Sequence, residues 1–99
     1  MSFPLYAGSN KDNYTPNVTL AFSAANDGSA SQSQATIENK SQEALEYCRA
    51  RFVMAKGDYK KVSGEGRIID SYDSSNGATI VLAEIPVAAQ NAATLEIGR

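Results

Sequence analysis

The chain has 99 residues, a formal net charge of −2 and a pI near 5.0, with one cysteine and no histidine or tryptophan. Its length fits one domain, and its acidic balance argues against a general nucleic-acid binder, which needs an excess of Lys and Arg. The lack of histidine removes the commonest general base and metal ligand, and a single cysteine permits no internal disulfide.

Residues 1–16 are expected to form an extended N-terminal arm ahead of a single domain at residues 17–99. Pro4 and Pro16 disfavour a regular helix in this segment, and the residues between them favour turns. The first residues do not show the basic start followed by an apolar run that would indicate a signal peptide. No stretch approaches the roughly 18 apolar residues of a membrane helix. We therefore expect synthesis in the cytoplasm and no membrane partner.

Alternating apolar positions predict a strand at residues 18–22. A polar loop rich in small residues follows at 24–34. Two further runs, at 35–39 and 44–54, can alternate between an inner and an outer face, and a polar bend separates them.

The run at 44–54 predicts a strand with one apolar face and one cationic face, because side chains in a strand alternate between faces. The inner face would carry Cys48, Ala50, Phe52 and Met54. The outer face would carry Tyr47, Arg49, Arg51 and Val53. Helical periodicity also fits residues 41–56, so an α+β fold with one helix there is the alternative.

Residues 59–72 are expected to form one long strand or two short ones, because Gly64 and Gly66 indicate a bulge or kink. The segment 74–77 ends in Asn-Gly, a pair that suits the primed turns of β-hairpins. A hairpin should therefore join the strands on either side of it.

Residues 78–87 are apolar on both faces in their middle, which predicts a central strand. A bend at 88–92 and a closing strand at 93–97 complete the chain. The expected fold is all-β: an Ig-like β-sandwich of about seven short strands with an extended N-terminal arm.

The order of these segments resembles the bacterial Ig-like β-sandwich domains of the FxLYD type. The matching pieces are TIENKS (36–41), ALEYCRARFVMAKGDYKKV (44–62), SGEGRI (63–68) and VAAQNAATLEI (87–97). The chain has FVMAKGD where the name motif would lie and inserts a hairpin around SYDSSNGATIVLAEI. The resemblance implies a small interaction or structural module without an active site.

A cationic strip is the first candidate site. Arg49 and Arg51, together with Lys60 and Lys61 on a neighbouring strand, would dock an acidic partner surface or a carboxylate, to which Arg offers a planar fork of donors. The alternative is a solvated outer face, because exposed ion pairs contribute little free energy.

Other reactive side chains favour structural roles. Asp70, Asp73 and Asn76 offer a few oxygens to a calcium ion, but such residues are ordinary in hairpin turns. Cys48 has no histidine to activate it and is expected to be a small buried apolar residue. The sequence therefore predicts no metal, no cofactor and no catalytic residue.

The arm carries apolar residues that need a partner. Phe3, Leu5 and Tyr6 would pack either on their own sandwich as an extra edge strand or on a neighbouring subunit. The sequence leaves these two alternatives open.

These observations favour a non-catalytic subunit that acts by protein–protein contact within a larger assembly or homo-oligomer. A bacteriophage virion protein, such as a capsid decoration or tail-associated subunit, fits best, and the protein would then be incorporated into the particle. The residues expected to contact a partner are Phe3, Leu5, Tyr6, Tyr47, Arg49 and Arg51. The alternative is a carbohydrate- or small-ligand-binding module that uses the exposed aromatic rings of Tyr14, Tyr47, Tyr59 and Tyr72.

Overall fold

A computed structural model of the protein describes residues 18–99, except for the side chains of Glu46 and Tyr47. The predicted arm at residues 1–16 lies outside the described residues. The described chain forms seven strands and no helix: β1 (Val18–Phe22), β2 (Gln32–Asn39), β3 (Leu45–Ala55), β4 (Lys60–Gly64), β5 (Arg67–Asp73), β6 (Ala78–Val87) and β7 (Asn91–Gly98).

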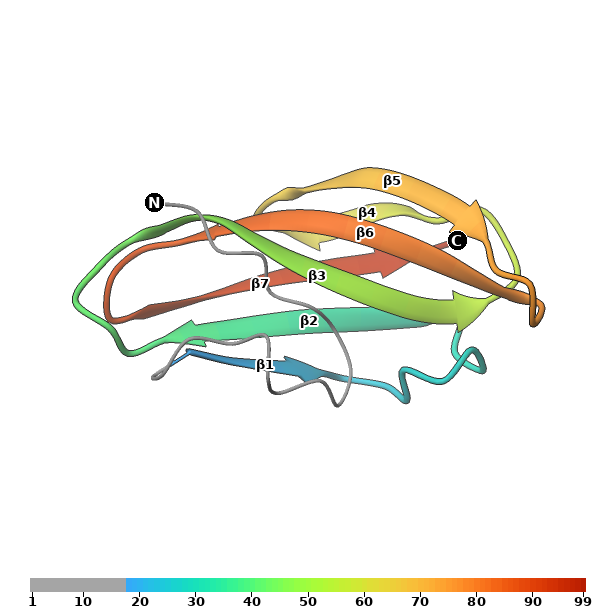
Figure 1. Cartoon of the computed structure of the whole chain (residues 1–99), viewed down its shortest axis with the longest axis horizontal. Helices are drawn as coiled ribbons and strands as arrows, with labels where there is room; N and C mark the ends of the chain where they lie inside the picture. Colours follow the sequence, from blue (N-terminus) through green and yellow to red (C-terminus); the bar gives the residue numbers. More distant parts are fainter. Residues whose placement is uncertain (1–17) are drawn as a thin grey trace.

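The strands form two antiparallel sheets packed face to face. One sheet has the order β1-β2-β7-β4 and the other β3-β6-β5. Figure 1 shows the two layers, with β3 and β6 crossing over β7. The predicted all-β sandwich of about seven short strands is confirmed. In a constant-type immunoglobulin domain the fifth strand lies beside the second and the seventh beside the sixth, whereas here β7 lies beside β2 and β5 beside β6.

The core lies between the sheets and is filled by alternate residues of the inner strands. On β3 the residues at spacing two, Cys48, Ala50, Phe52 and Met54, are fully buried. Arg49 and Arg51, which lie between them, are exposed. A helix would place neighbouring buried residues three or four positions apart, so the alternative helix at 41–56 is wrong.

The polar segment before β2 is shorter than expected. The loop predicted at 24–34 gives way to strand at Gln32, because Ser33 occupies an inward position opposite Ile97 of β7. Ser33 is buried, and its hydroxyl has no hydrogen-bond partner among the described residues. The sequence QSQ has no apolar residue to indicate this extension.

The loop between β1 and β2 protects part of the free edge of β3. The Asn26 side chain makes the backbone hydrogen bonds that a neighbouring strand would make. Its Oδ1 accepts the Val53 N–H at 2.7 Å, and its Nδ2 donates to the Arg51 carbonyl at 3.1 Å. The Gly28 N–H donates to the Val53 carbonyl, and the Ala55 N–H donates to the Ala30 carbonyl. Covering an edge in this way limits pairing with other chains.

Two glycines carry the chain from one sheet to the other. Gly64 and Gly66 have φ of 97° and 91°, and a Cβ on either would lie 2.2 Å from a carbonyl oxygen, of Thr94 and of Glu84 respectively. Residues 59–72 therefore form two strands, β4 and β5, and these belong to opposite sheets. The predicted kink is the crossing between the layers.

The β5–β6 hairpin forms as predicted, but its turn is not of the primed type, because Asn76 does not have the positive φ that such a turn requires. The Gly77 N–H donates to the Ser74 carbonyl at 3.2 Å, and Gly77 has a φ of 89°. β6 is the central strand of its sheet, as its apolar middle predicts. The expected closing strand at 93–97 is confirmed as β7, which begins two residues earlier, at Asn91.

Candidate docking surface

Three strands bring two arginines to one glutamate on the outer face of the β3-β6-β5 sheet. Glu84 of β6 pairs with Arg49 of β3 and with Arg67 of β5 in the strand register. Its carboxylate lies 3.8 Å from the Arg49 guanidinium and 3.4 Å from that of Arg67. The Glu84 side chain is 16% exposed, while those of Arg49 and Arg67 are 50% and 76% exposed. The anion is thus enclosed and the cations remain in contact with solvent.

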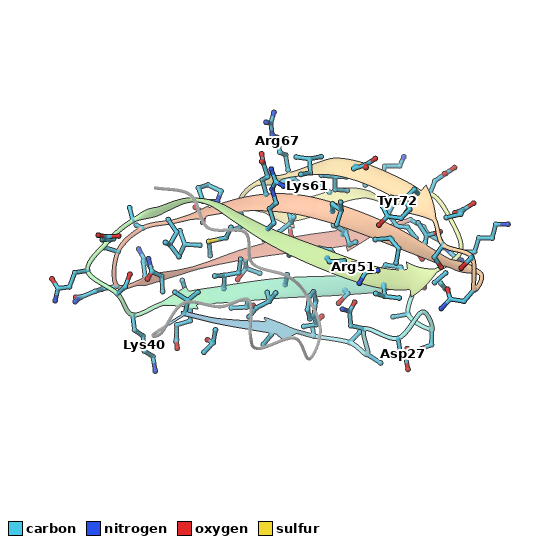
Figure 2. The ribbon with its side chains drawn as sticks, viewed as in Figure 1. Asp27, Lys40, Arg51, Lys61, Arg67 and Tyr72 are labelled. Atoms are coloured by element: carbon cyan, nitrogen blue, oxygen red, sulfur yellow. The ribbon has the colours of Figure 1, made fainter. Side chains whose placement is uncertain are left out.

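Apolar side chains continue this face beside the arginines. The next register row joins Arg51, Leu82 and Asp70. Leu82 is half-buried, and Ile69, at the irregularity of β5, is 37% exposed. Tyr72, further along β5, is 47% exposed. Figure 2 shows Arg51 on β3 and both Arg67 and Tyr72 on β5.

We call this surface the arginine face. It is made of Arg49, Arg51, Arg67, Ile69, Asp70, Leu82, Tyr72 and Glu84.

The outer face of the other sheet is different, because its polar side chains pair with one another. The Glu96 carboxylate accepts hydrogen bonds from the Gln32 amide at 2.6 Å and from the Ser63 hydroxyl at 3.0 Å. The hydroxyls of Thr36 and Thr94 lie 3.4 Å apart. These polar groups of the β1-β2-β7-β4 sheet are thus engaged with one another.

The structure brings only part of the predicted cationic strip together. Arg49 and Arg51 lie on the arginine face, but Lys60 and Lys61 lie on β4, in the opposite sheet. The prediction that these lysines neighbour the arginines is wrong, because the crossing before β5 separates them. The Lys61 ammonium donates to the Gly66 carbonyl at 2.9 Å.

Arg67 takes the place that was expected for the lysines. The turn offered no signal for it, because constant pairing outward from the turn would set Arg67 opposite the buried Ile85. Arg67 meets Glu84 because the register of β5 shifts between Ile68 and Asp70.

Several predicted contact residues lie outside the described part of the protein. These are Phe3, Leu5 and Tyr6 of the arm, and the side chain of Tyr47.

The two tyrosines whose side chains the structure describes, Tyr59 and Tyr72, do not together form the aromatic platform that a carbohydrate site would need. Tyr59 is buried, and its hydroxyl donates to the Ala55 carbonyl. Tyr14 lies outside the described residues. Tyr72 is the exposed tyrosine among the described side chains.

The reactive groups named from the sequence are engaged in local contacts. Asp70 accepts the Ser71 N–H, and Asp73 accepts the Thr79 hydroxyl. Asn76 accepts the Ser74 hydroxyl. Residues 18–99 contain no cluster of three or more potential metal ligands.

Cys48 is fully buried. Burial raises the pKa of its thiol to about 11, from an ordinary value of 9.0. Since the thiolate is the nucleophile, this side chain is poorly suited to react at neutral pH.

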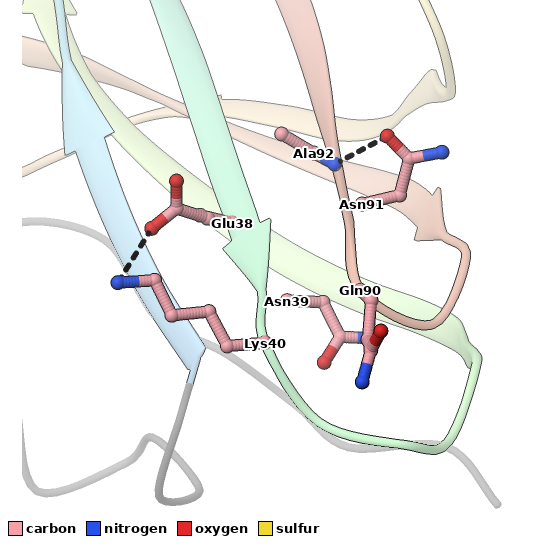
Figure 3. A pocket seen from close by; sticks show the side chains of 6 residues that line it. All are labelled: Glu38, Asn39, Lys40, Gln90, Asn91 and Ala92. Carbon is pink, nitrogen blue, oxygen red and sulfur yellow. Dashed lines mark hydrogen bonds and ion pairs between the residues drawn. The ribbon is translucent and has the colours of Figure 1, made fainter.

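An open hollow of about 410 Å³ lies at one end of the sandwich, where β2 ends and β7 begins (Figure 3). It is lined by Glu38, Asn39, Lys40, Gln90, Asn91 and Ala92. Glu38 and Lys40 form an ion pair at 3.4 Å, and the Asn91 Oδ1 accepts the Ala92 N–H. The Asn39 amide bonds to the two neighbouring loops. These groups hold the loops in place rather than converge on a ligand.

No protein-family model, curated protein or solved structure matches this chain. The resemblance to FxLYD-type domains therefore stays a prediction. Within residues 18–99 there is no helix long and apolar enough to cross a membrane.

Proposed function

We propose that this protein is a non-catalytic assembly subunit that acts by protein–protein contact through the arginine face. One observation carries the proposal: Arg51, Arg67 and Tyr72 share one sheet face with exposed and half-buried aliphatic residues. Arg and Tyr are enriched in protein interfaces and among the residues that contribute most of the binding energy. The self-paired polar face of the other sheet supports the choice of this side.

The setting that we propose is a multi-subunit particle, with a bacteriophage virion as its most specific form. In a virion the protein would be a capsid decoration or tail-associated subunit. The resemblance to a family of interaction modules supports this setting. The apolar residues Phe3, Leu5 and Tyr6 add a second contact in the proposal, since an extended segment can join a sheet edge of a neighbour.

A non-catalytic role is supported by the chemistry of the chain. It contains no histidine, and burial raises the pKa of its one thiol. The described carboxylates of the β5–β6 hairpin accept local hydrogen bonds.

The test is the mass of the untagged protein in its source extract, measured by size-exclusion chromatography with light scattering. We expect elution with a particle of far greater mass than the chain. Elution as a free species near 10.5 kDa would contradict an assembly role.

A further inference from the structure

The arginine face carries more positive charge than its own acids neutralise. Glu84 is shared between Arg49 and Arg67, and each guanidinium has five N–H donors. One carboxylate in monodentate contact with both leaves most of these donors without a partner among the described residues.

Arg51 adds a third cation to this surface. Its neighbour across the strand register is Leu82 rather than an acid. Among the described residues no ion pair involves Arg51 or Asp70. The Asp70 carboxylate instead accepts the N–H of Ser71.

The apolar part of the face lies directly beside these cations. Leu82 stands between Arg51 and Asp70 in one register row, and Ile69 and Tyr72 flank it on β5. A partner that covers these side chains would exclude water from the guanidinium groups. Contacts to charged groups are strongest where water is excluded, provided that each charge meets a counter-charge.

We infer that the arginine face binds a partner protein surface that presents carboxylates around an apolar side chain. This inference rests on the proposed function and names the chemistry of the partner. Arg51 and Arg67 would take the carboxylates, while Leu82 and Tyr72 would contact the apolar side chain.

Two other occupants fit the charges less well. A second copy that used the same surface would bring the arginines against one another, because an isologous contact pairs a patch with itself. A nucleic acid calls for a row of cations along a backbone, whereas these three arginines lie together on a chain of net charge −2.

The experiment places a lysine amine where Arg51 lies. The Arg51→Lys variant, bound to its particle in the source extract, is treated with a water-soluble carbodiimide. The reagent activates a partner carboxylate as an O-acylisourea. The lysine amine then attacks the acyl carbon, forming an amide bond and releasing a urea. Peptide mass spectrometry identifies the linked acid.

The matched control is Ala21→Lys, which places the same amine on an exposed position of β1 in the opposite sheet. A second variant, Arg51→Glu, reverses the charge at an exposed position, where substitutions usually change stability little. We expect a cross-link from position 51 to an Asp or Glu of another protein, and none from position 21. We also expect at least tenfold less Arg51→Glu than wild-type protein in the particle.

Three results would overturn the inference. If the wild type and the Arg51→Lys variant are both in the particle but the variant forms no cross-link from position 51, the carboxylate partner is refuted and the proposed function stands. Equal incorporation of Arg51→Glu and the wild type would do the same. Wild-type protein that elutes free would contradict the proposed function and this inference together.

Discussion

The buried amide of Asn39 ties together two loops at one end of the sandwich, so Asn39→Ala should destabilise the fold markedly. Asn39 is fully buried at the end of β2. Its Nδ2 donates to the Glu43 carbonyl at 2.8 Å and to the Ala88 carbonyl at 3.2 Å. Its Oδ1 accepts the Ser41 N–H at 3.0 Å and the Ser41 hydroxyl at 2.6 Å.

The magnitude follows from these four hydrogen bonds. Each contributes about 1 kcal/mol net, which sets an upper value of about 4 kcal/mol. Glu43 and Ala88 are exposed and Ser41 is partly exposed, so water can replace some of the lost partners. We therefore expect Asn39→Ala to lower the free energy of unfolding by about 2 to 3 kcal/mol, out of the roughly 5 to 15 kcal/mol that is typical of a domain.

The assay is equilibrium unfolding in urea, followed by circular dichroism. Asn91→Ala is the matched control, because Asn91 is exposed at the same end and the hydrogen bond that its side chain makes goes to the adjacent Ala92 N–H. We expect a loss below about 0.5 kcal/mol for that control, as for most surface substitutions. A loss below 0.5 kcal/mol for Asn39→Ala itself would refute the argument that this amide holds the loops.

Three further predictions concern the strand connections and the core. Gly66→Ala should lower the free energy of unfolding by about 3 kcal/mol or more, because its Cβ would meet the Glu84 carbonyl oxygen at 2.2 Å. Gly77 has open space around it, so Gly77→Ala should cost only the roughly 1 to 2 kcal/mol of a left-handed backbone. Equal losses for the two variants in urea unfolding would contradict this. Asn26→Ala should lower stability by about 1 to 2 kcal/mol and increase aggregation measured by light scattering, because it uncovers the edge of β3; unchanged scattering would argue against a protective loop. The stability that Cys48 contributes should be complete below pH 9 and decrease as the pH rises through about 11, by about 1.4 kcal/mol per pH unit, because the unfolded chain loses the thiol proton first. Under reducing conditions, the free energy of unfolding of the wild type should therefore exceed that of Cys48→Ala by less at pH 10.5 than at pH 8. A constant difference between the two proteins would refute this.

The elements that local patterns define could be predicted from the sequence. The alternation of Cys48, Ala50, Phe52 and Met54 indicated the buried face of β3, and Asn-Gly indicated the β5–β6 turn. Both signals depend on neighbouring residues alone, so they do not depend on where the rest of the chain lies.

The assignment of strands to sheets could not be predicted in the same way. Gly64 and Gly66 indicated a kink, but whether the chain stays in one sheet or crosses to the other depends on the partners that the flanking strands find. This choice put Lys60 and Lys61 on β4, in the sheet opposite the arginine face, and put Arg67 on that face. The extent of β2 was also hidden, because the inward residue there, Ser33, is polar.

The central place of β7 has a consequence for how the protein folds as it is made. β7 lies between β2 and β4, and 58 residues separate Thr36 from its neighbour Thr94. During synthesis, β1, β2 and β4 all emerge before β7, the strand that joins β2 to β4. Until β7 is made, the edges of β2 and β4 that it will pair with stay unpaired. The β5–β6 hairpin and its pairing with β3 involve shorter separations. The half of the sandwich that carries the arginine face can therefore form first, and it then offers a template on which the late strand assembles.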